Sequence, residues 1–202
     1  MAFVQNFSII TLNNDLLEAT SNNDYNRVLY LIHSSHEYRF IKTIYSVIIN
    51  AINYSLIIAC ENRNHVLVSY FIKEGANLKI IGGCALKIAC QKGELLIVKC
   101  LVDNGAKIGE DDNWDLKYAI MQNHIDIIKY LFSKKIYYTN DVVNFVLLAL
   151  KCYNFEMATF MIKKYKLNFK FFTSINYDYE VYIDEQTKKF NNFKVKIYKK
   201  YN

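Results

Sequence analysis

Residues 85–106 read Ala85-Leu86-Lys87-Ile88-Ala89-Cys90-Gln91-Lys92-Gly93-Glu94-Leu95-Leu96-Ile97-Val98-Lys99-Cys100-Leu101-Val102-Asp103-Asn104-Gly105-Ala106. Apolar residues at i, i+3 and i+4 over positions 86–90 predict a first helix of about two turns. Gly93 then interrupts the pattern, because glycine is unfavourable inside a helix and permissive in a turn. A second apolar stripe covers residues 97–102, and Gly105 supplies a left-handed helix stop. The stretch therefore predicts two short helices joined by a turn.

The same pattern recurs every thirty residues along the chain. Its columns are Ala59, Ala89, Ala119 and Ala149; Leu56, Leu86, Leu116 and Val146; Val68, Val98, Ile128 and Ala158; and Phe71, Leu101, Leu131 and Met161. An earlier copy is centred on Ala19, forty residues before Ala59. Because a two-helix unit cannot bury its own apolar face, such units stack into an array. We predict about five repeats, at 16–34, 56–78, 86–108, 116–138 and 146–168, with an insertion near 35–49.

The stretch quoted above resembles an ankyrin repeat, whose pattern is T-P-L-H-x-A-A-x-x-G-H-x-x-V-V-x-x-L-L-x-x-G-A. It departs from that pattern at Cys84-Ala85, Lys87, Cys90 and Glu94. The resemblance extends over residues 13–168 and implies an all-α, ankyrin-type helix-turn-helix solenoid, here followed by a small β or irregular C-terminal cap. The short repeats and the proline-free composition, rich in Asn, Ile, Lys and Tyr, also resemble ankyrin proteins of large DNA viruses and intracellular bacteria.

The resemblance implies a non-catalytic interaction module or scaffold that binds another protein through a concave face of first helices and turns. Ankyrin repeats have about 33 residues, so the thirty-residue repeats here predict short turns in place of long fingers. Contacts are therefore expected at the ends of the first helices. The candidates are Glu61, Asn62, Gln91, Lys92, Met121, Gln122, Lys151 and Cys152. The alternative is that they are only solvated helix ends.

No sequence motif for catalysis is present. Walker, GxGxxG and GxSxG patterns are absent, and Gly82-Gly83 and residues 105–109 are interpreted as turns between repeats. Trp114 is interpreted as a partly buried inter-repeat contact, with a binding anchor as the alternative. Structural or surface roles are expected for His33, His36, His65 and His124, the last of them supporting loop hydrogen bonds. The acidic run at 110–112 is expected to be a solvated turn. We expect no enzyme activity, cofactor or metal site.

The cysteines and the apolar stretches bear on the compartment. Cys60, Cys84, Cys90, Cys100 and Cys152 form no CxxC pair, and we expect them to be reduced and mostly buried. The sequence starts without a signal-peptide pattern, and residues 43–60 are interpreted as a pair of packed helices rather than a membrane span. We therefore expect a monomer in the cytoplasm, that of the host if the source is a virus or an intracellular bacterium.

The net charge of +6 is concentrated in the last seventeen residues, which contain no acid. Their lysines are Lys188, Lys189, Lys194, Lys196, Lys199 and Lys200. Apolar and polar residues alternate over 177–184 and 193–198, which predicts two strands that could form a hairpin cap over the last repeat. The alternative for residues 169–202 is a basic arm that binds nucleic acid or another polyanion.

Overall fold

The computed structural model describes residues 9–36 and 42–167 of the 202-residue chain. These residues form helices and no strand, so the described part of the chain is all-α, as predicted. The helices are α1 (Ile9–Ser21), α2 (Tyr25–Ser35), α3 (Lys42–Glu61), α4 (His65–Lys73), α5 (Leu78–Lys92), α6 (Leu95–Asp103), α7 (Glu110–Met121), α8 (Ile125–Lys134), α9 (Thr139–Lys151) and α10 (Phe155–Tyr165). The predicted cap or basic arm at 169–202 lies outside the described residues.

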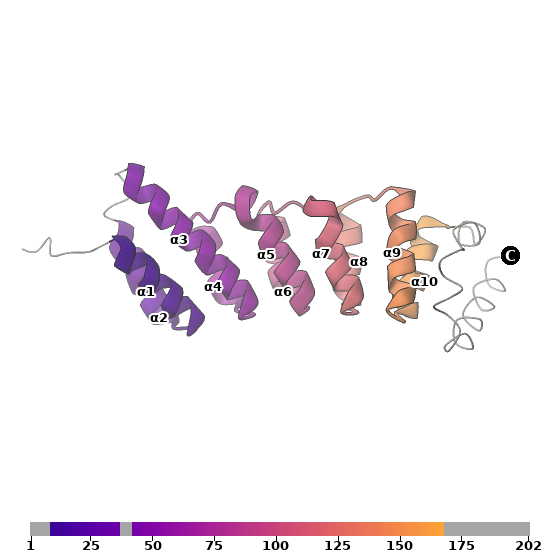
Figure 1. The fold of residues 1–202 in the computed structure, drawn as a ribbon, viewed down its shortest axis with the longest axis horizontal. Coiled ribbons are helices and arrows are strands. Elements are labelled where there is room, and N and C mark those ends of the chain that lie inside the picture. The colour runs from indigo at the N-terminus through magenta and orange to yellow at the C-terminus, as the bar shows by residue number, and fades with distance from the viewer. Residues whose placement is uncertain (1–8, 37–41, 168–202) are drawn as a thin grey trace, which may run out of the picture. The chain divides into compact units, whose positions relative to one another are not determined.

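The helices belong to two compact units, one ending at Ile127 and the other beginning at Ile128. In the first unit, α1 packs against α3, α3 against α5, and α5 against α7 (Figure 1). These first helices form one layer, and their hairpin partners α2, α4 and α6 form a second layer behind them. In the second unit, α9 packs against α10. Helical hairpins are thus the building block of both units.

Each hairpin turns at a residue with a left-handed backbone. These residues are Asn23, Arg63, Gly93, Asn123 and Tyr153. The amide of the next residue donates a hydrogen bond to the carbonyl of the repeat alanine five residues earlier, as from Glu94 to Ala89 at 3.0 Å. All five alanines, from Ala19 to Ala149, have an exposed fraction of 0%. The alanine column is therefore buried at the turn that joins the two helices of each hairpin.

The apolar columns predicted from the thirty-residue period form the core of both units. Within the columns led by Leu56, Val68 and Phe71, every member has an exposed fraction of 0%. Burial of one face on every helix is what stacking of incomplete two-helix units requires. The predicted core is confirmed.

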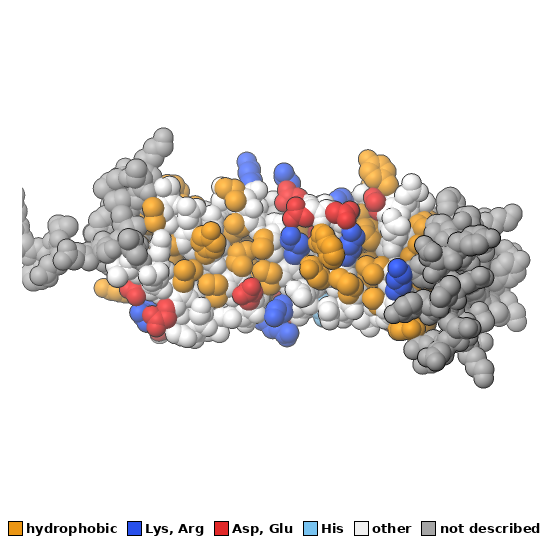
Figure 2. All heavy atoms as spheres, in the orientation of Figure 1, with side chains coloured by type: hydrophobic (Ala, Val, Ile, Leu, Met, Phe, Trp, Pro, Cys, Tyr) orange, Lys and Arg blue, Asp and Glu red, His pale blue; other side chains and the backbone are white. Residues whose placement is uncertain are grey.

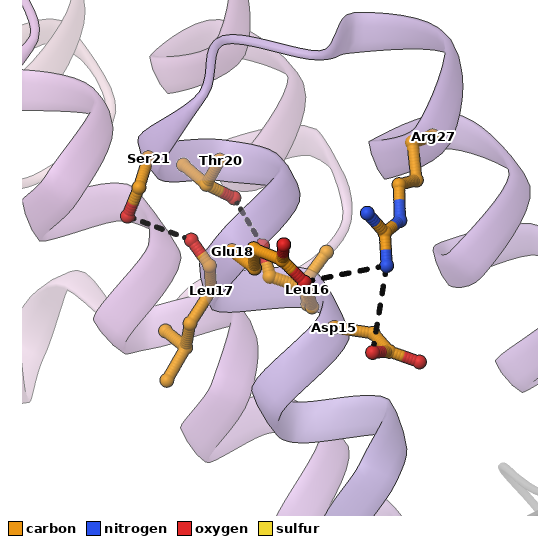
Figure 3. Close-up of polar contacts among 7 residues, drawn as sticks. All are labelled: Asp15, Leu16, Leu17, Glu18, Thr20, Ser21 and Arg27. Atoms are coloured by element: carbon orange, nitrogen blue, oxygen red, sulfur yellow. Dashed lines mark hydrogen bonds and ion pairs between the residues drawn. The ribbon is translucent and has the colours of Figure 1, made fainter.

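The first hairpin is also tied together by side chains (Figure 3). Asp24 caps α2, because its carboxylate accepts a hydrogen bond from the amide of Arg27 at 3.0 Å. The guanidinium of Arg27 reaches back to Asp15 and Glu18 on α1, at 3.5 and 3.4 Å. These groups are largely exposed, so each ion pair contributes at most about 1 kcal/mol.

The structure corrects the prediction for residues 43–60. They lie in one helix, α3, which spans twenty residues, rather than in two packed helices. The stretch contains no glycine or proline to end a helix, and its polar Asn53 has a partner. The Asn53 side-chain oxygen accepts a hydrogen bond of 2.7 Å from the amide of Asn77, before α5. A buried asparagine here joins two repeats and does not mark a turn.

The structure also corrects the reading of Gly82-Gly83, which lie inside α5 and not in a turn. As a result α5 is fifteen residues long, about twice the predicted length. A Cβ added at Gly82 would lie 3.1 Å from the Cβ of Ala106 in the next turn. Glycine is therefore used at this position for a close approach between neighbouring repeats. Only residues 107–109 separate that turn from α7, so the inter-repeat connection is short, as predicted.

The second unit contains an aromatic cluster between α8, α9 and α10. The ring of Phe132 lies 4.8 Å from that of Tyr137 and 6.4 Å from that of Phe145, measured between centroids. The hydroxyl of Tyr165 accepts a hydrogen bond of 3.2 Å from the amide of Tyr137. Aromatic side chains thus fill the space between the α8–α9 connection and the last hairpin.

Candidate functional site

The predicted contact residues all lie at the C-terminal ends of first helices. The last residues of α3, α5, α7 and α9 are Glu61, Lys92, Met121 and Lys151. Their sequence neighbours among the candidates are Asn62, Gln91, Gln122 and Cys152. Met121 and Cys152 are half-buried and the others are exposed. The residues from Glu61 to Gln122 lie in the first unit, and Lys151 and Cys152 lie in the second.

Some groups at these helix ends are used to join the repeats of the first unit. The side-chain nitrogen Nδ2 of Asn62 donates to the carbonyls of Thr20 and Ser21 at 3.2 and 3.1 Å. The imidazole Nε2 of His124 lies 3.2 Å from the carbonyl oxygen of Gln91, and because a carbonyl only accepts, this nitrogen carries the proton. The loop role predicted for His124 is confirmed. The side chains of Gln91 and Lys92 are exposed beside this contact.

A larger apolar surface lies on the same helices of the first unit. Of its residues, the sequence analysis named Met121 as a contact candidate and gave Trp114 a binding anchor as the alternative. Positions i, i+3, i+4 and i+7 on α3, α5 and α7 point away from the core. We call the apolar residues there the first-helix face. Three of them are exposed, namely Tyr54, Cys84 and Trp114, and five are half-buried, namely Ile57, Ile58, Ile88, Tyr118 and Met121. Tyr54 has an exposed fraction of 67% and Trp114 of 41%. Figure 2 shows hydrophobic side chains gathered over these three helices.

The thirty-residue period contained the signal for this face. Tyr54, Cys84 and Trp114 each lie two residues before the buried leucine column, and Ile58, Ile88 and Tyr118 each lie two residues after it. Trp114, interpreted from the sequence as an inter-repeat contact, has its ring 5.3 Å from the ring of Tyr118 on its own helix. With an exposed fraction of 41%, Trp114 is partly buried, as predicted.

Two lysines lie within the first-helix face, and each is paired with an aspartate. The ammonium of Lys87 lies 2.9 Å from Asp111, and that of Lys117 pairs with Asp112 and lies 5.0 Å from the ring centroid of Trp114. The hydrogen bond that the Lys87 ammonium donates to Asp111 raises the pKa of Lys87 and thereby favours its charged form. The aspartates of the acidic run are therefore solvated, as predicted, with exposed fractions of 68% and 80%, and they also contact the first-helix face.

The cysteines differ in exposure more than the sequence suggested. Cys60 and Cys90 are fully buried, and desolvation raises the pKa of Cys60 from 9.0 to about 12 and that of Cys90 well above 9.0. Their burial is as predicted, and because the thiolate is the nucleophile, the raised pKa values make these two thiols poor nucleophiles. Cys100 and Cys152 are half-buried with pKa values raised mainly by desolvation, whereas Cys84 is exposed on the first-helix face. The expectation of mostly buried cysteines is therefore wrong for Cys84.

The described residues contain no group of three or more His, Cys, Asp or Glu side chains arranged to hold a metal ion. His33 and His36 are neighbours, with ring centroids 5.5 Å apart, and Nε2 of His36 lies 3.1 Å from Glu74. Over residues 9–36 and 42–167, no helix has both the length and the apolar character needed to cross a membrane.

Hairpins with one shared turn geometry and one shared core pattern define a helical repeat protein. A family model described as ankyrin repeats, in three copies, matches residues 16–112 and again 56–142, and the chain belongs to the ankyrin repeat family. Ankyrin repeats are generally protein-interaction modules and are generally non-enzymatic.

An ankyrin repeat protein of Acanthamoeba polyphaga mimivirus is 35% identical to this chain over 100 residues. The aligned region covers 48% of this chain and 25% of the viral protein, so the chain matches only a quarter of that relative's length. The similarity agrees with the resemblance to viral ankyrin repeats.

Proposed function

We propose that this chain is a non-catalytic interaction module and scaffold that binds a protein partner through the first-helix face. The proposal rests on the apolar surface of exposed and half-buried side chains that continues from α3 across α5 to α7. Apolar patches of this kind on a folded surface mark interaction sites, whereas single exposed apolar residues do not. The chain acts in this role as a cytoplasmic monomer, in the host cell if its source is a virus or an intracellular bacterium.

The composition of the face fits a binding surface with an apolar centre and a polar rim. Tyr54, Trp114 and Tyr118 supply large side chains of the type that dominates binding energy at interfaces. The residues at the helix ends, including Glu61, Gln91, Lys92 and Gln122, supply the polar rim on one side. In this proposal the helix-end candidates contribute specificity, and the apolar residues contribute most of the affinity.

Photo-crosslinking from Cys84 tests the location of this surface. A benzophenone is attached to Cys84 in the full chain carrying Cys100→Ser and Cys152→Ser, and crosslinked proteins from native extract are identified by mass spectrometry. In the control protein, Cys84→Ser is added and the benzophenone is attached to a new cysteine, Leu96→Cys, on the second-helix layer. Leu96 has an exposed fraction of 64%, so the two probes are both accessible.

We expect a protein to be crosslinked from position 84 and not from position 96. Adding Tyr118→Ser should reduce its yield at least about tenfold, because truncating an interface aromatic typically weakens binding by that much or more. Equal crosslinking from both positions, or a yield that is insensitive to Tyr118→Ser, would contradict the proposal.

A second candidate function is polyanion binding by the lysine-rich tail, which the charge distribution of the sequence favours. If the tail binds nucleic acid, the affinity should fall steeply with rising salt, because bound lysines release counterions. We expect deletion of residues 186–202 to abolish such binding in a filter or anisotropy assay. Binding that is insensitive to salt or to the deletion would rule this function out.

A further inference from the structure

The positive charge of the first-helix face is placed in the middle of its apolar residues. Lys87 and Lys117 occupy one repeat column, on neighbouring helices, at the position that Ile57 holds on α3. Their side chains have exposed fractions of only 27% and 26%. Each lysine has an apolar residue one helical turn before it and another directly after it. These residues are Cys84 and Ile88 for Lys87, and Trp114 and Tyr118 for Lys117. A partner that covers this face must therefore cover both ammonium groups.

Covering an ammonium group removes its water, which is costly unless a carboxylate or another acceptor replaces that water. The present acceptors are Asp111 and Asp112, whose exposed fractions are 68% and 80%. They reach the lysines from the edge of the face, at the start of α7. Surface pairs of this kind are weak and exchange readily with competing anions.

The backbone that carries these aspartates is unfavourable for L-residues. Asp111, Asp112 and Asn113 have φ angles of 48°, 60° and 58°, so three non-glycine residues in succession are left-handed. The segment on either side is held in place, because the buried carboxylate of Asp115 accepts a 2.7 Å hydrogen bond from the amide of Gly109. The two aspartates can therefore leave the lysines without disturbing the helix that follows.

We propose that the partner segment bound by the first-helix face is apolar and carries an Asp or Glu carboxylate, which replaces Asp111 and Asp112 as the ion partner of Lys87 and Lys117. The two aspartates act in the free protein as internal substitutes for that carboxylate. This proposal rests on the proposed function, because it assigns the chemistry of the partner at the same face. A neutral apolar segment would leave the internal pairs unchanged.

A phage-displayed library of random 16-residue peptides tests this assignment on the full chain. The variants are Lys87→Gln/Lys117→Gln, which removes both cations, and Asp111→Asn/Asp112→Asn, which removes both internal competitors. A Lys79→Gln/Lys99→Gln chain is the matched control, because these exposed lysines lie outside the face. Circular dichroism melts establish that each variant is folded.

We expect the wild type and the control to select apolar peptides that are enriched in Asp or Glu. The Lys87→Gln/Lys117→Gln variant should still select apolar peptides, but without the enrichment in Asp or Glu. Selected acidic peptides should bind that variant at least about tenfold more weakly. They should bind Asp111→Asn/Asp112→Asn up to about fivefold more tightly, a gain that a purely structural role of the aspartates would not produce.

Two results would overturn the carboxylate assignment and leave the proposed function unaffected. One is that the selected apolar peptides are not enriched in Asp or Glu. The other is that this enrichment persists in the Lys87→Gln/Lys117→Gln variant. Weaker binding of acidic peptides to Asp111→Asn/Asp112→Asn would also overturn it. Selection of no peptide by any chain would overturn both proposals.

Discussion

Replacing Phe71 with alanine is expected to lower the free energy of unfolding by about 3–5 kcal/mol, the usual cost of truncating a buried phenylalanine. Phe71 lies on α4, has an exposed fraction of 0% and is among the largest fully buried side chains of the described residues. The loss combines the lost burial of the ring with the cavity that the rigid helical hairpins cannot fill. Urea denaturation followed by far-ultraviolet circular dichroism measures it.

The matched control is Leu96→Ala, which truncates an exposed apolar residue on the neighbouring helix α6 and should cost no more than about 0.5 kcal/mol. In a repeat array each unit is stabilised mainly by its neighbours, so the damage at Phe71 should spread locally. Hydrogen exchange should therefore accelerate first in α4 and in α3 and α6, which pack against it. Similar losses for the two variants would show that the Phe71 column is not the core.

The repeat and its core were predictable because burial imposes a fixed spacing. Every helical hairpin must bury one apolar face against its neighbours, so columns such as that of Ala89 and that of Leu101 recur at the repeat length. The turn geometry was less visible in the sequence. In the five hairpins the left-handed turn position is occupied by four residue types, Asn, Arg, Gly and Tyr, and only Gly93 is a glycine. The backbone hydrogen bond to the alanine carbonyl sets that conformation, and a side-chain pattern does not record it.

The extents of α3 and α5 were mispredicted for a related reason. Asn53 and Gly82 are poor helix residues by local propensity. Residues 43–60 were predicted as two helices and Gly82-Gly83 as a turn. Each is instead explained by a contact with the following repeat, Asn53 with the amide of Asn77 and Gly82 with Ala106. Contacts between repeats outweigh propensities of about 1 kcal/mol, and the sequence period does not reveal them.

The sequence indicated the helices that carry the candidate site, but only some residues of the first-helix face, namely Met121 and, as an alternative, Trp114. The resemblance pointed to the first helices, where the exposed face lies. An apolar residue such as Ile58, two residues after the core Leu56, cannot be distinguished from a core residue until the orientation of the helix is known. The pairing of Lys87 with Asp111 depends on the left-handed backbone at the start of α7, which nothing in the repeat pattern anticipates.

Replacing Gly93 with alanine is expected to lower the free energy of unfolding by about 2–3 kcal/mol, from two separate costs. The backbone of Gly93 has a φ of +80°, which costs an L-residue about 1–2 kcal/mol. The new Cβ would also lie 2.5 Å from Cε1 of His124, so the imidazole must move and give up its hydrogen bond to Gln91, worth about 1 kcal/mol. Thermal and urea denaturation measure the sum.

Gly105→Ala separates the two costs, because Gly105 has a φ of +100° but its Cβ would meet nothing within 4 Å. It should cost only the conformational part, about 1–2 kcal/mol. In a chain that already carries His124→Ala, the steric part at Gly93 disappears, and Gly93→Ala should then cost about as much as Gly105→Ala. A double-mutant cycle therefore yields a coupling near 1 kcal/mol between positions 93 and 124. Strict additivity would mean that the imidazole does not lock the two neighbouring hairpins together.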